Sequence, residues 1–150
     1  MKKINFSFNH SNRRLHNWLI YDLNDKWLNY SLKYVNGVLF DLGCGEMPYK
    51  DGFNQYITNY IGVDWEESIH ENKADIIADL NKILPIKDCT ADTIISLSVI
   101  EHLYDPQVFL IESFRILKNN GYMILQVPWQ WMIHEAPFDF YRYTPFGLKH

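Results

Sequence analysis

The chain has few cysteines, no long hydrophobic run and no clustering of positive charge. Cys44 and Cys89 are far apart and outside any metal-type or C-x-x-C spacing, so neither a disulfide framework nor a zinc site is indicated. No apolar run approaches the roughly 20 residues that span a bilayer, and the first residues lack the apolar core of a signal peptide. These absences favour a cytoplasmic protein with reduced thiols and no membrane span.

Charge and length narrow the class of protein further. The 14 basic and 18 acidic residues give a net charge of −4, and no basic stretch exceeds two residues, which argues against a nucleic-acid partner. A length of 150 residues with 47% hydrophobic residues suffices for one compact domain, and no linker or repeat interrupts it. The sequence therefore predicts a single domain over residues 1–150.

Hydrophobic spacing predicts the order of helices and strands. Apolar residues three or four apart favour an N-terminal helix over about residues 12–35. Short apolar runs predict strands at 38–40, 60–64, 74–78, 93–98 and 122–127. A short helix is expected at 48–57 and a longer one from Pro106 to a turn at 119–121, with no long helix between 79 and 91. This alternation is typical of an α/β fold with a mainly parallel sheet and helices on both faces.

The ends of the first strands carry residues that suit a nucleoside. Gly43 and Gly45 follow the first strand, where their lack of a side chain lets the backbone turn sharply and approach a ligand. Asp64 closes the second strand and can accept hydrogen bonds from ribose hydroxyls. Asp79 ends the third run, where a carboxylate can accept from an amino group such as that of adenine. Since ligands of such sheets bind at the carboxyl ends of strands, these residues predict a nucleoside site.

The same turn discriminates between nucleoside cofactors. A nicotinamide or flavin dinucleotide requires a third glycine three places after the second, and that place is Pro48. Asp41, two positions before Gly43, adds a negative charge that would repel a pyrophosphate and attract an ammonium or sulfonium group. This favours S-adenosylmethionine, with a nicotinamide-dependent oxidoreductase as an alternative.

Several segments, in order, resemble a known family. Residues 38–45, V-L-F-D-L-G-C-G, resemble the first motif of class I S-adenosylmethionine-dependent methyltransferases, and residues 60–64 resemble their second. Residues 78–86, 91–95 and 98–103 are similar to the third and fourth segments, and residues 114–122 resemble the passage into the fifth strand. The match runs from about Gly37 to Pro128, and Met47 stands where the first motif usually has its third glycine.

This resemblance implies a fold and a set of cofactor contacts. The fold would be a Rossmann-like, doubly wound sheet of order 3-2-1-4-5, with the family's last two strands missing before His150. The glycines would border the methionine part of S-adenosylmethionine, Asp64 the ribose, and Asp79 with Leu80 the adenine. The expected cofactor-binding residues are Asp41, Gly43, Cys44, Gly45, Asp64, Trp65, Asp79, Leu80 and Ser98.

The acceptor side is expected after the fourth and fifth strands. His102 is the candidate base for a hydroxyl acceptor, or else a residue that orients its loop, with Glu101 as its partner or as an ordinary charge at a helix start. The aromatic segment 129–150 resembles the substrate-side loop of small-molecule methyltransferases, including those of polysaccharide and lipid-glycan systems, or else packs over the sheet. Its candidate substrate-binding residues are Trp129, His134, Asp139 and Arg142.

His134-Glu135 does not complete a metalloprotease motif, because Phe138 occupies the place of the second histidine, so no metal is expected. The sequence thus predicts a methyltransferase acting on a small-molecule or glycan-intermediate acceptor. The alternative is a truncated or non-catalytic domain that binds the cofactor or a partner. A sheet ending at the fifth strand would have an uncovered edge, which favours association between copies of the chain.

Overall fold

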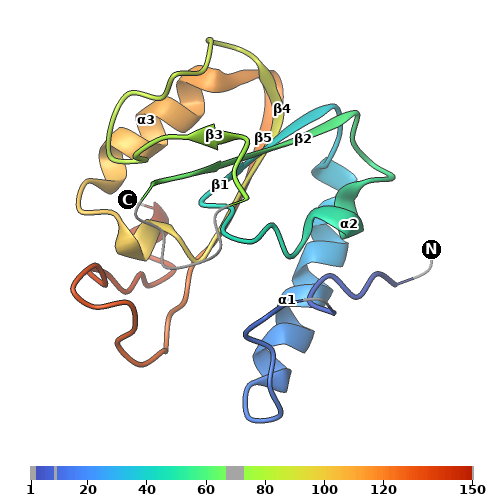
Figure 1. The fold of residues 1–150 in the computed structure, drawn as a ribbon, viewed down its shortest axis with the longest axis vertical. Coiled ribbons are helices and arrows are strands. Elements are labelled where there is room, and N and C mark those ends of the chain that lie inside the picture. Colours follow the sequence, from blue (N-terminus) through green and yellow to red (C-terminus); the bar gives the residue numbers. More distant parts are fainter. Residues whose placement is uncertain (1–2, 9, 67–72, 150) are drawn as a thin grey trace.

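The computed structural model describes residues 3–8, 10–66 and 73–149 (Figure 1). The regular elements are α1 (Trp18–Ser31), β1 (Val38–Leu42), α2 (Lys50–Phe53), β2 (Asn59–Asp64), β3 (Ile76–Ile77), β4 (Ala91–Leu97), α3 (Pro106–Ile116) and β5 (Leu117–Gln126). Short 3₁₀ turns lie at η1 (Leu32–Tyr34), η2 (Ile100–His102) and η3 (Gly147–Lys149). None of the helices in this described part is long and apolar enough to cross a membrane.

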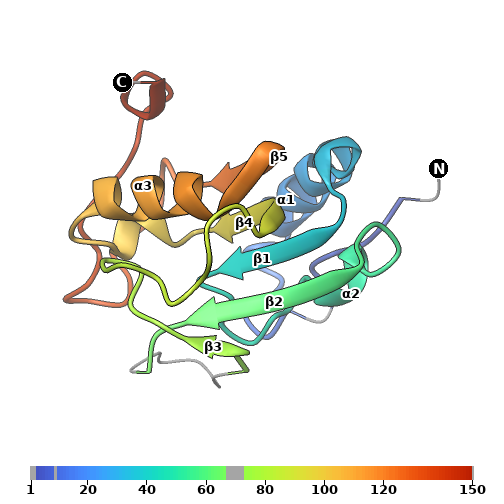
Figure 2. The same cartoon turned by 90° about the horizontal axis from the view of Figure 1, so that it is seen from above.

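The five strands form one parallel sheet of order β3-β2-β1-β4-β5 (Figure 2). β1 is central, with Leu39 paired to Tyr60 of β2 and to Thr93 of β4. The predicted α/β class and strand order are therefore confirmed. β5 pairs with β4 alone within the described sheet, and the association expected from this edge stays a prediction.

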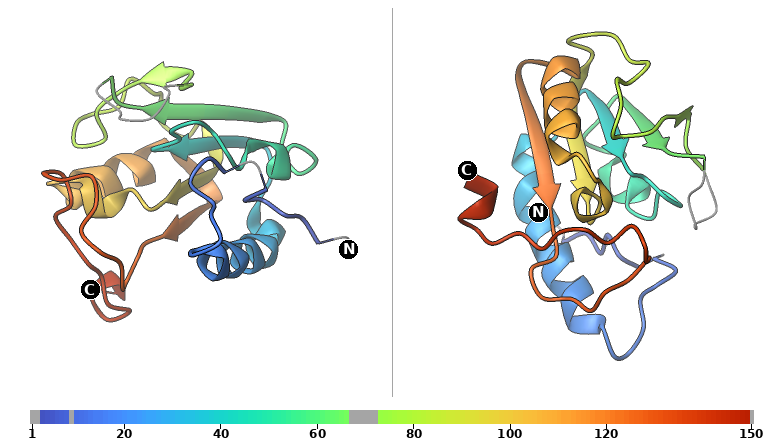
Figure 3. Two further views of the ribbon diagram at one scale, coloured as in Figure 1. Left: turned by 60° about the horizontal axis from the view of Figure 1, so that its bottom comes forward. Right: turned by 90° about the vertical axis from the view of Figure 1, so that its left-hand side faces the viewer.

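Helices cover both faces of the sheet, as Figures 2 and 3 show. Successive side chains of a strand point to opposite faces, so Phe40 joins the core under α3 with Phe109. Its neighbour Leu39 joins the other core, with Leu28 of α1 and Phe53 of α2. Burial on both sides explains why the strands read as short continuous apolar runs.

The N-terminal helix is shorter than the predicted span of 12–35, since α1 begins at Trp18 and η1 follows Ser31. The first half of α1 projects beyond the sheet (Figure 1), so Leu23 is 53% exposed, and Leu15, which precedes α1, is 93% exposed, although both fit the apolar spacing. The second half is fastened instead by Leu28 and by buried Asp25, whose carboxylate accepts hydrogen bonds from the Ser7 backbone and hydroxyl at 2.9 Å.

Three other boundaries differ from the prediction. α2 covers four residues of the expected 48–57, and β3 covers two of 74–78. β5 begins at Leu117 rather than 122, because the turn expected at 119–121 lies within the strand. There the β4–β5 register shifts between Ala91 and Thr93, and Asn120 has a φ of +66°. The Asn-Asn-Gly signal therefore marks an irregularity in the strand and not the end of a helix.

The connection from β3 to β4 contains no long helix, as predicted, and is held by side chains of α3. Glu112 accepts a hydrogen bond from the Leu84 backbone N–H at 2.8 Å. Arg115 donates to the carbonyl oxygens of Leu84 and Ile86 at 3.1 and 2.7 Å, and pairs with Glu112 at 2.6 Å. The side chains of Glu112 and Arg115 thus satisfy backbone polar groups of this connection, which a crossover helix would satisfy through its own hydrogen bonds.

We expect Arg115→Met to lower the free energy of unfolding by about 2 kcal/mol, because it leaves Glu112 and two loop carbonyls without their charged partner. Urea denaturation measures this. Lys26→Met is the matched control, since Lys26 pairs with Asp22 on the exposed side of α1 and its replacement should cost little stability. Equal decreases in the free energy of unfolding of the two variants would contradict the conclusion that Arg115 stabilises this connection.

Candidate cofactor and acceptor site

The turn after β1 is fastened to the end of β2. The backbone N–H groups of Gly43 and Cys44 donate to the Val63 carbonyl at 2.8 and 3.1 Å, and that of Gly45 donates to Asp64 Oδ2 at 2.6 Å. Gly43 has a φ of +85°, and a Cβ there would collide with the Val99 side chain, so the turn requires glycine. The two strand ends that the sequence assigns to one site therefore touch.

The turn continues in an unusual conformation at Met47, where the family motif has its third glycine. Met47 has a φ of +52°, in the left-handed region that glycine adopts at no cost. Its side chain packs over Gly62, where a Cβ would collide with Met47 Cε. Cys44 is 3% exposed beside it, and burial raises the pKa of its thiol, which fits a small side chain filling the turn.

The structure corrects the electrostatic role expected of Asp41. Its carboxyl group is 3% exposed and accepts a hydrogen bond from the Tyr60 hydroxyl, so it does not face a ligand as a solvated charge. Burial raises its pKa to about 7, partly opposed by the hydrogen bond from Tyr60. Near neutral pH this group is thus divided between its charged and neutral forms.

Asp64 lies at the tip of β2 and is 8% exposed. Besides the bond from Gly45, its Oδ1 accepts from the Trp65 N–H at 2.8 Å. Its carbonyl accepts from the Ala78 N–H at 2.8 Å, which places Asp79 on the adjoining strand end. The predicted ribose and adenine residues thus come from neighbouring strand tips.

Asp79 and Leu80 already have partners within the protein. Asp79 pairs with Lys82 at 3.1 Å and accepts from the Asn81 N–H at 2.9 Å; although burial opposes it, these bonds lower the pKa of Asp79. Leu80 is 6% exposed and belongs to the core under α3. Any adenine contact would therefore share a carboxylate that is already hydrogen-bonded.

Ser98 lies at the tip of β4 with its side chain exposed and a φ of +58°. Its N–H and hydroxyl donate to the carbonyl and the side-chain oxygen of Gln126 at 2.9 and 3.1 Å. This pairing ties the ends of β4 and β5 together at the edge where the cofactor is expected.

A hollow of about 360 Å³ adjoins the glycine turn. Its lining contains none of the predicted cofactor residues and consists of Glu46, Met47, Pro48, Lys50, Asp51 and Lys73. Sequence reasoning did not select these residues, because surface charges and a helix-starting proline give no ligand signal of their own.

The segment after β5 returns to the strand ends and docks on η2 (Figure 3). The N–H groups of Phe140 and Tyr141 donate to the Glu101 carbonyl at 2.8 and 3.2 Å. The ring of Phe138 meets Trp65 edge to face, with centroids 5.3 Å apart. The expected acceptor segment thus touches the cofactor side of the site.

Asp139 and Arg142, two of the expected substrate-binding residues, form an ion pair. They pair with each other through both Asp139 oxygens, one at 2.7 Å, and the Asp139 side chain is only 2% exposed. Arg142 also donates to the Met132 carbonyl at 3.1 Å, and its ion pair lowers the pKa of Asp139. This pair holds the shape of the segment, and the substrate role expected of the two residues stays a prediction. Trp129, by contrast, is 62% exposed.

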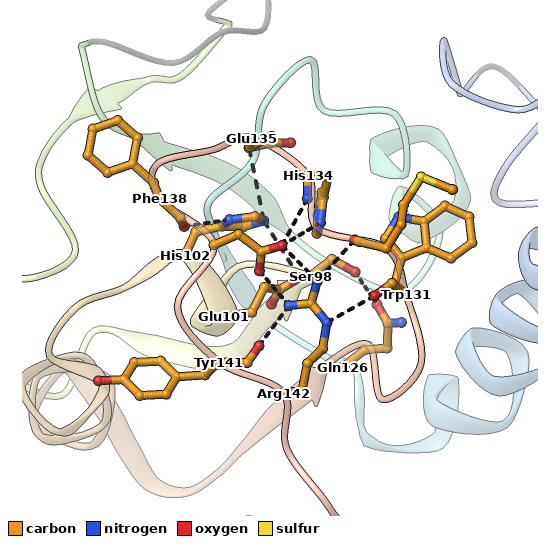
Figure 4. Close-up of polar contacts among 12 residues, drawn as sticks. Ser98, Glu101, His102, Gln126, Trp131, His134, Glu135, Phe138, Tyr141 and Arg142 are labelled. Atoms are coloured by element: carbon orange, nitrogen blue, oxygen red, sulfur yellow. Dashed lines mark hydrogen bonds and ion pairs between the residues drawn. The ribbon is translucent and has the colours of Figure 1, made fainter.

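His102 faces a cluster of polar groups in Figure 4. Its Nδ1 lies 2.9 Å from the Phe138 carbonyl, and its Nε2 lies 3.7 Å from Glu101 Oε1 and 4.0 Å from Glu135 Oε2. The His134 ring meets it edge to face at 4.7 Å. The base role predicted for His102 and the substrate role predicted for His134 stay predictions.

Glu101 is the most unusual member of this cluster. Its side chain is fully buried, and neither carboxylate oxygen has a hydrogen-bond partner in the part of the chain that the structure describes. Burial raises the pKa of Glu101 to about 7. From the sequence, Glu101 was expected only as a partner of His102 or as an ordinary charge. The position of an acidic residue after a strand does not show that its side chain is buried.

The geometry and the comparisons with known proteins agree on the family. A family model described as "Methyltransferase domain" matches residues 40–125, more than half of the chain. The chain therefore belongs to the class I S-adenosylmethionine-dependent methyltransferases, whose cofactor is S-adenosylmethionine. The predicted family and cofactor are confirmed, and the nicotinamide-dependent alternative is wrong.

Relatives and solved structures give the extent of the likeness. A Mycolicibacterium smegmatis protein named "Probable S-adenosylmethionine-dependent methyltransferase" is 29% identical over 96 residues, covering 60% of this chain and 37% of that protein. An "Uncharacterized methyltransferase" of Schizosaccharomyces pombe is 31% identical over 115 residues, covering 63% and 41%. The chain thus spans well under half the length of these curated relatives.

An S-adenosylmethionine-dependent methyltransferase structure from Archaeoglobus fulgidus has a TM-score of 0.65 at 21% identity, covering 85% of this chain and 65% of that one. One from Aquifex aeolicus has a TM-score of 0.59 at 19% identity, covering 78% and 71%. At these identities the likeness concerns the fold.

The buried Asp41 predicts a defined pH dependence of stability. Between about pH 4 and pH 7 the unfolded chain loses the Asp41 proton while the folded chain keeps it, so the free energy of unfolding falls as pH rises. We expect Asp41→Asn to remove up to about 4 kcal/mol of this fall. Urea melts of both proteins at several pH values isolate the effect, and a difference between them that stays constant across this window would refute it.

Proposed function

We propose that this chain binds S-adenosylmethionine across the ends of β1 and β2 and transfers its methyl group to a small-molecule or glycan-intermediate acceptor. The observation that carries the proposal is the 2.6 Å bond from the Gly45 N–H to Asp64 Oδ2, which joins the glycine turn to the acid within the family match. The segment from Trp129 to Tyr143 lies on the acceptor side, beyond the ends of β4 and β5.

The chemistry available at the strand ends suits this cofactor. Each Asp64 oxygen accepts one backbone N–H and retains lone pairs for the ribose hydroxyls. The N–H groups of Gly43, Cys44 and Gly45 are bound to β2, so carbonyl oxygens are what the turn offers to an ammonium group. S-Adenosylmethionine supplies an activated methyl group for an in-line displacement. The protein's contribution is then to position the acceptor and exclude water.

Surface chemistry supports the class of acceptor. Trp129 and Ile133 are 62% and 79% exposed on the acceptor segment and offer apolar faces to a sugar or planar ring. A net charge of −4 gives the chain no overall positive potential that would attract a nucleic acid. The cysteines are free thiols, with Cys89 exposed, in keeping with the cytoplasmic location expected from the sequence.

Titration calorimetry with S-adenosylhomocysteine tests the cofactor site. We expect saturable binding, weakened about tenfold or more by Asp64→Asn, because a charged acceptor for the ribose and for Gly45 is lost. Asp22→Asn, an exposed change on α1, is the control and should bind as the unmodified chain does. A folded chain that gives no saturable heat would end the proposal.

Methyl release from labelled cofactor, screened against sugar, lipid-glycan and small aromatic acceptors, tests turnover. Transfer to one of these classes identifies the acceptor. Saturable binding of S-adenosylhomocysteine without transfer to any of them would favour the non-catalytic, cofactor-binding domain instead.

A further inference from the structure

We infer that Glu101, His102 and His134 form a site for one divalent transition-metal ion on the acceptor side of the cofactor site. One ligand atom from each residue lies within 4.8 Å of the other two. Two imidazole nitrogens and one carboxylate oxygen are donors that zinc and its neighbours in the first transition row prefer. Three protein ligands leave a coordination position open.

The strongest support is the state of Glu101. Its side chain is fully buried, and both carboxylate oxygens lack hydrogen bonds within the described residues. Arg142, which contributes charge from nearby, is already bound to Asp139 through two nitrogens. A buried carboxylate is costly unless it is paired or coordinates a metal. A bound cation would supply the partner that the protein itself does not.

His102 is oriented as a ligand would be. Its Nδ1 lies 2.9 Å from the Phe138 carbonyl, which can only accept, so Nδ1 carries the ring proton and a neutral ring has its lone pair on Nε2. This Nε2 lies 3.7 Å from Glu101 Oε1. Ligands of a tetrahedral zinc ion, with bonds of about 2.0–2.1 Å, lie roughly 3.4 Å apart. The pair therefore needs to close by only a few tenths of an ångström.

Asp139 adjoins His134 and holds its backbone in place. Asp139 Oδ2 lies 3.2 Å from its Nδ1 and accepts from its backbone N–H at 2.9 Å. His134 Nδ1 is buried and has no hydrogen-bond partner within the described residues, so it is a donor atom that an ion could bind. The ion pair of Asp139 with Arg142 keeps Asp139 in place beside this ring.

The place of the cluster suggests what the ion would do. Glu101 and His102 belong to η2, directly after β4, and His134 comes from the acceptor segment. If the chain transfers a methyl group as proposed, on which this role rests, the open position would bind an acceptor oxygen and lower the pKa of a hydroxyl there, so that its proton leaves to solvent. The oxygen would then form the O–CH3 bond as the S–CH3 bond of the cofactor breaks and S-adenosylhomocysteine leaves. The acceptor would then present a hydroxyl or carboxylate to the ion.

Metal binding can be measured without turnover. The chain, stripped with a chelator and carrying Cys89→Ser to remove the exposed thiol, is titrated with Zn²⁺ by calorimetry and with Co²⁺ by visible absorption. We expect one ion per chain, and Glu101→Gln and His134→Gln should each weaken its binding by at least about 100-fold, more than the loss of an outer support would. His16→Gln, on the exposed N-terminal side, is the matched control.

The same preparations are tested for folding by circular dichroism and for S-adenosylhomocysteine binding. Loss of the metal by folded variants that still bind S-adenosylhomocysteine supports the site. Absence of saturable metal binding, or binding that both variants leave intact, overturns it. The cofactor titration of the unmodified chain judges the methyltransferase proposal separately.

Discussion

The three N–H groups that the β1 turn donates to the end of β2 hold the ligand-binding edge of this molecule together. Gly43 allows the turn that makes these bonds, because Val99 occupies the space that a side chain at Gly43 would need. The ends of β1, β2 and β4 are thereby fixed to one another. Since every predicted cofactor contact comes from these strand ends or from the turns that follow them, the proposed site depends on the strand order of the sheet.

The sequence was sufficient for the sheet but not for the elements around it. Buried parallel strands leave short apolar runs, and crossover rules restrict their order, so β3-β2-β1-β4-β5 could be anticipated. The helix face of Leu15 and Leu23 has the correct period, yet period alone does not reveal whether a partner surface exists. Likewise Asn120 and Gly121 suit a helix end or a strand irregularity equally well, and only pairing with β4 decides.

The sequence was likewise sufficient to predict one part of the site and insufficient for another. Gly45 and Asp64 could be brought together from the sequence, because parallel strands end at a common edge. Burial of Asp41, which depends on Tyr60, could not be foreseen from a motif. Nor could the approach of His134 to Glu101, because the chain must complete β5 and turn back before the two meet. Local patterns identify strand-end chemistry, whereas contacts made by a returning segment require the fold.

Glu101 links two parts of the molecule through different atoms. Its backbone carbonyl anchors the returning segment at Phe140 and Tyr141, while its side chain faces the histidine that this segment carries. Any opening wide enough to admit a large acceptor would break the backbone anchor and withdraw His134 in the same movement. If the proposed ion binds there, its ligand set would be complete only with the segment closed, and entry of a large substrate would be coupled to assembly of that site.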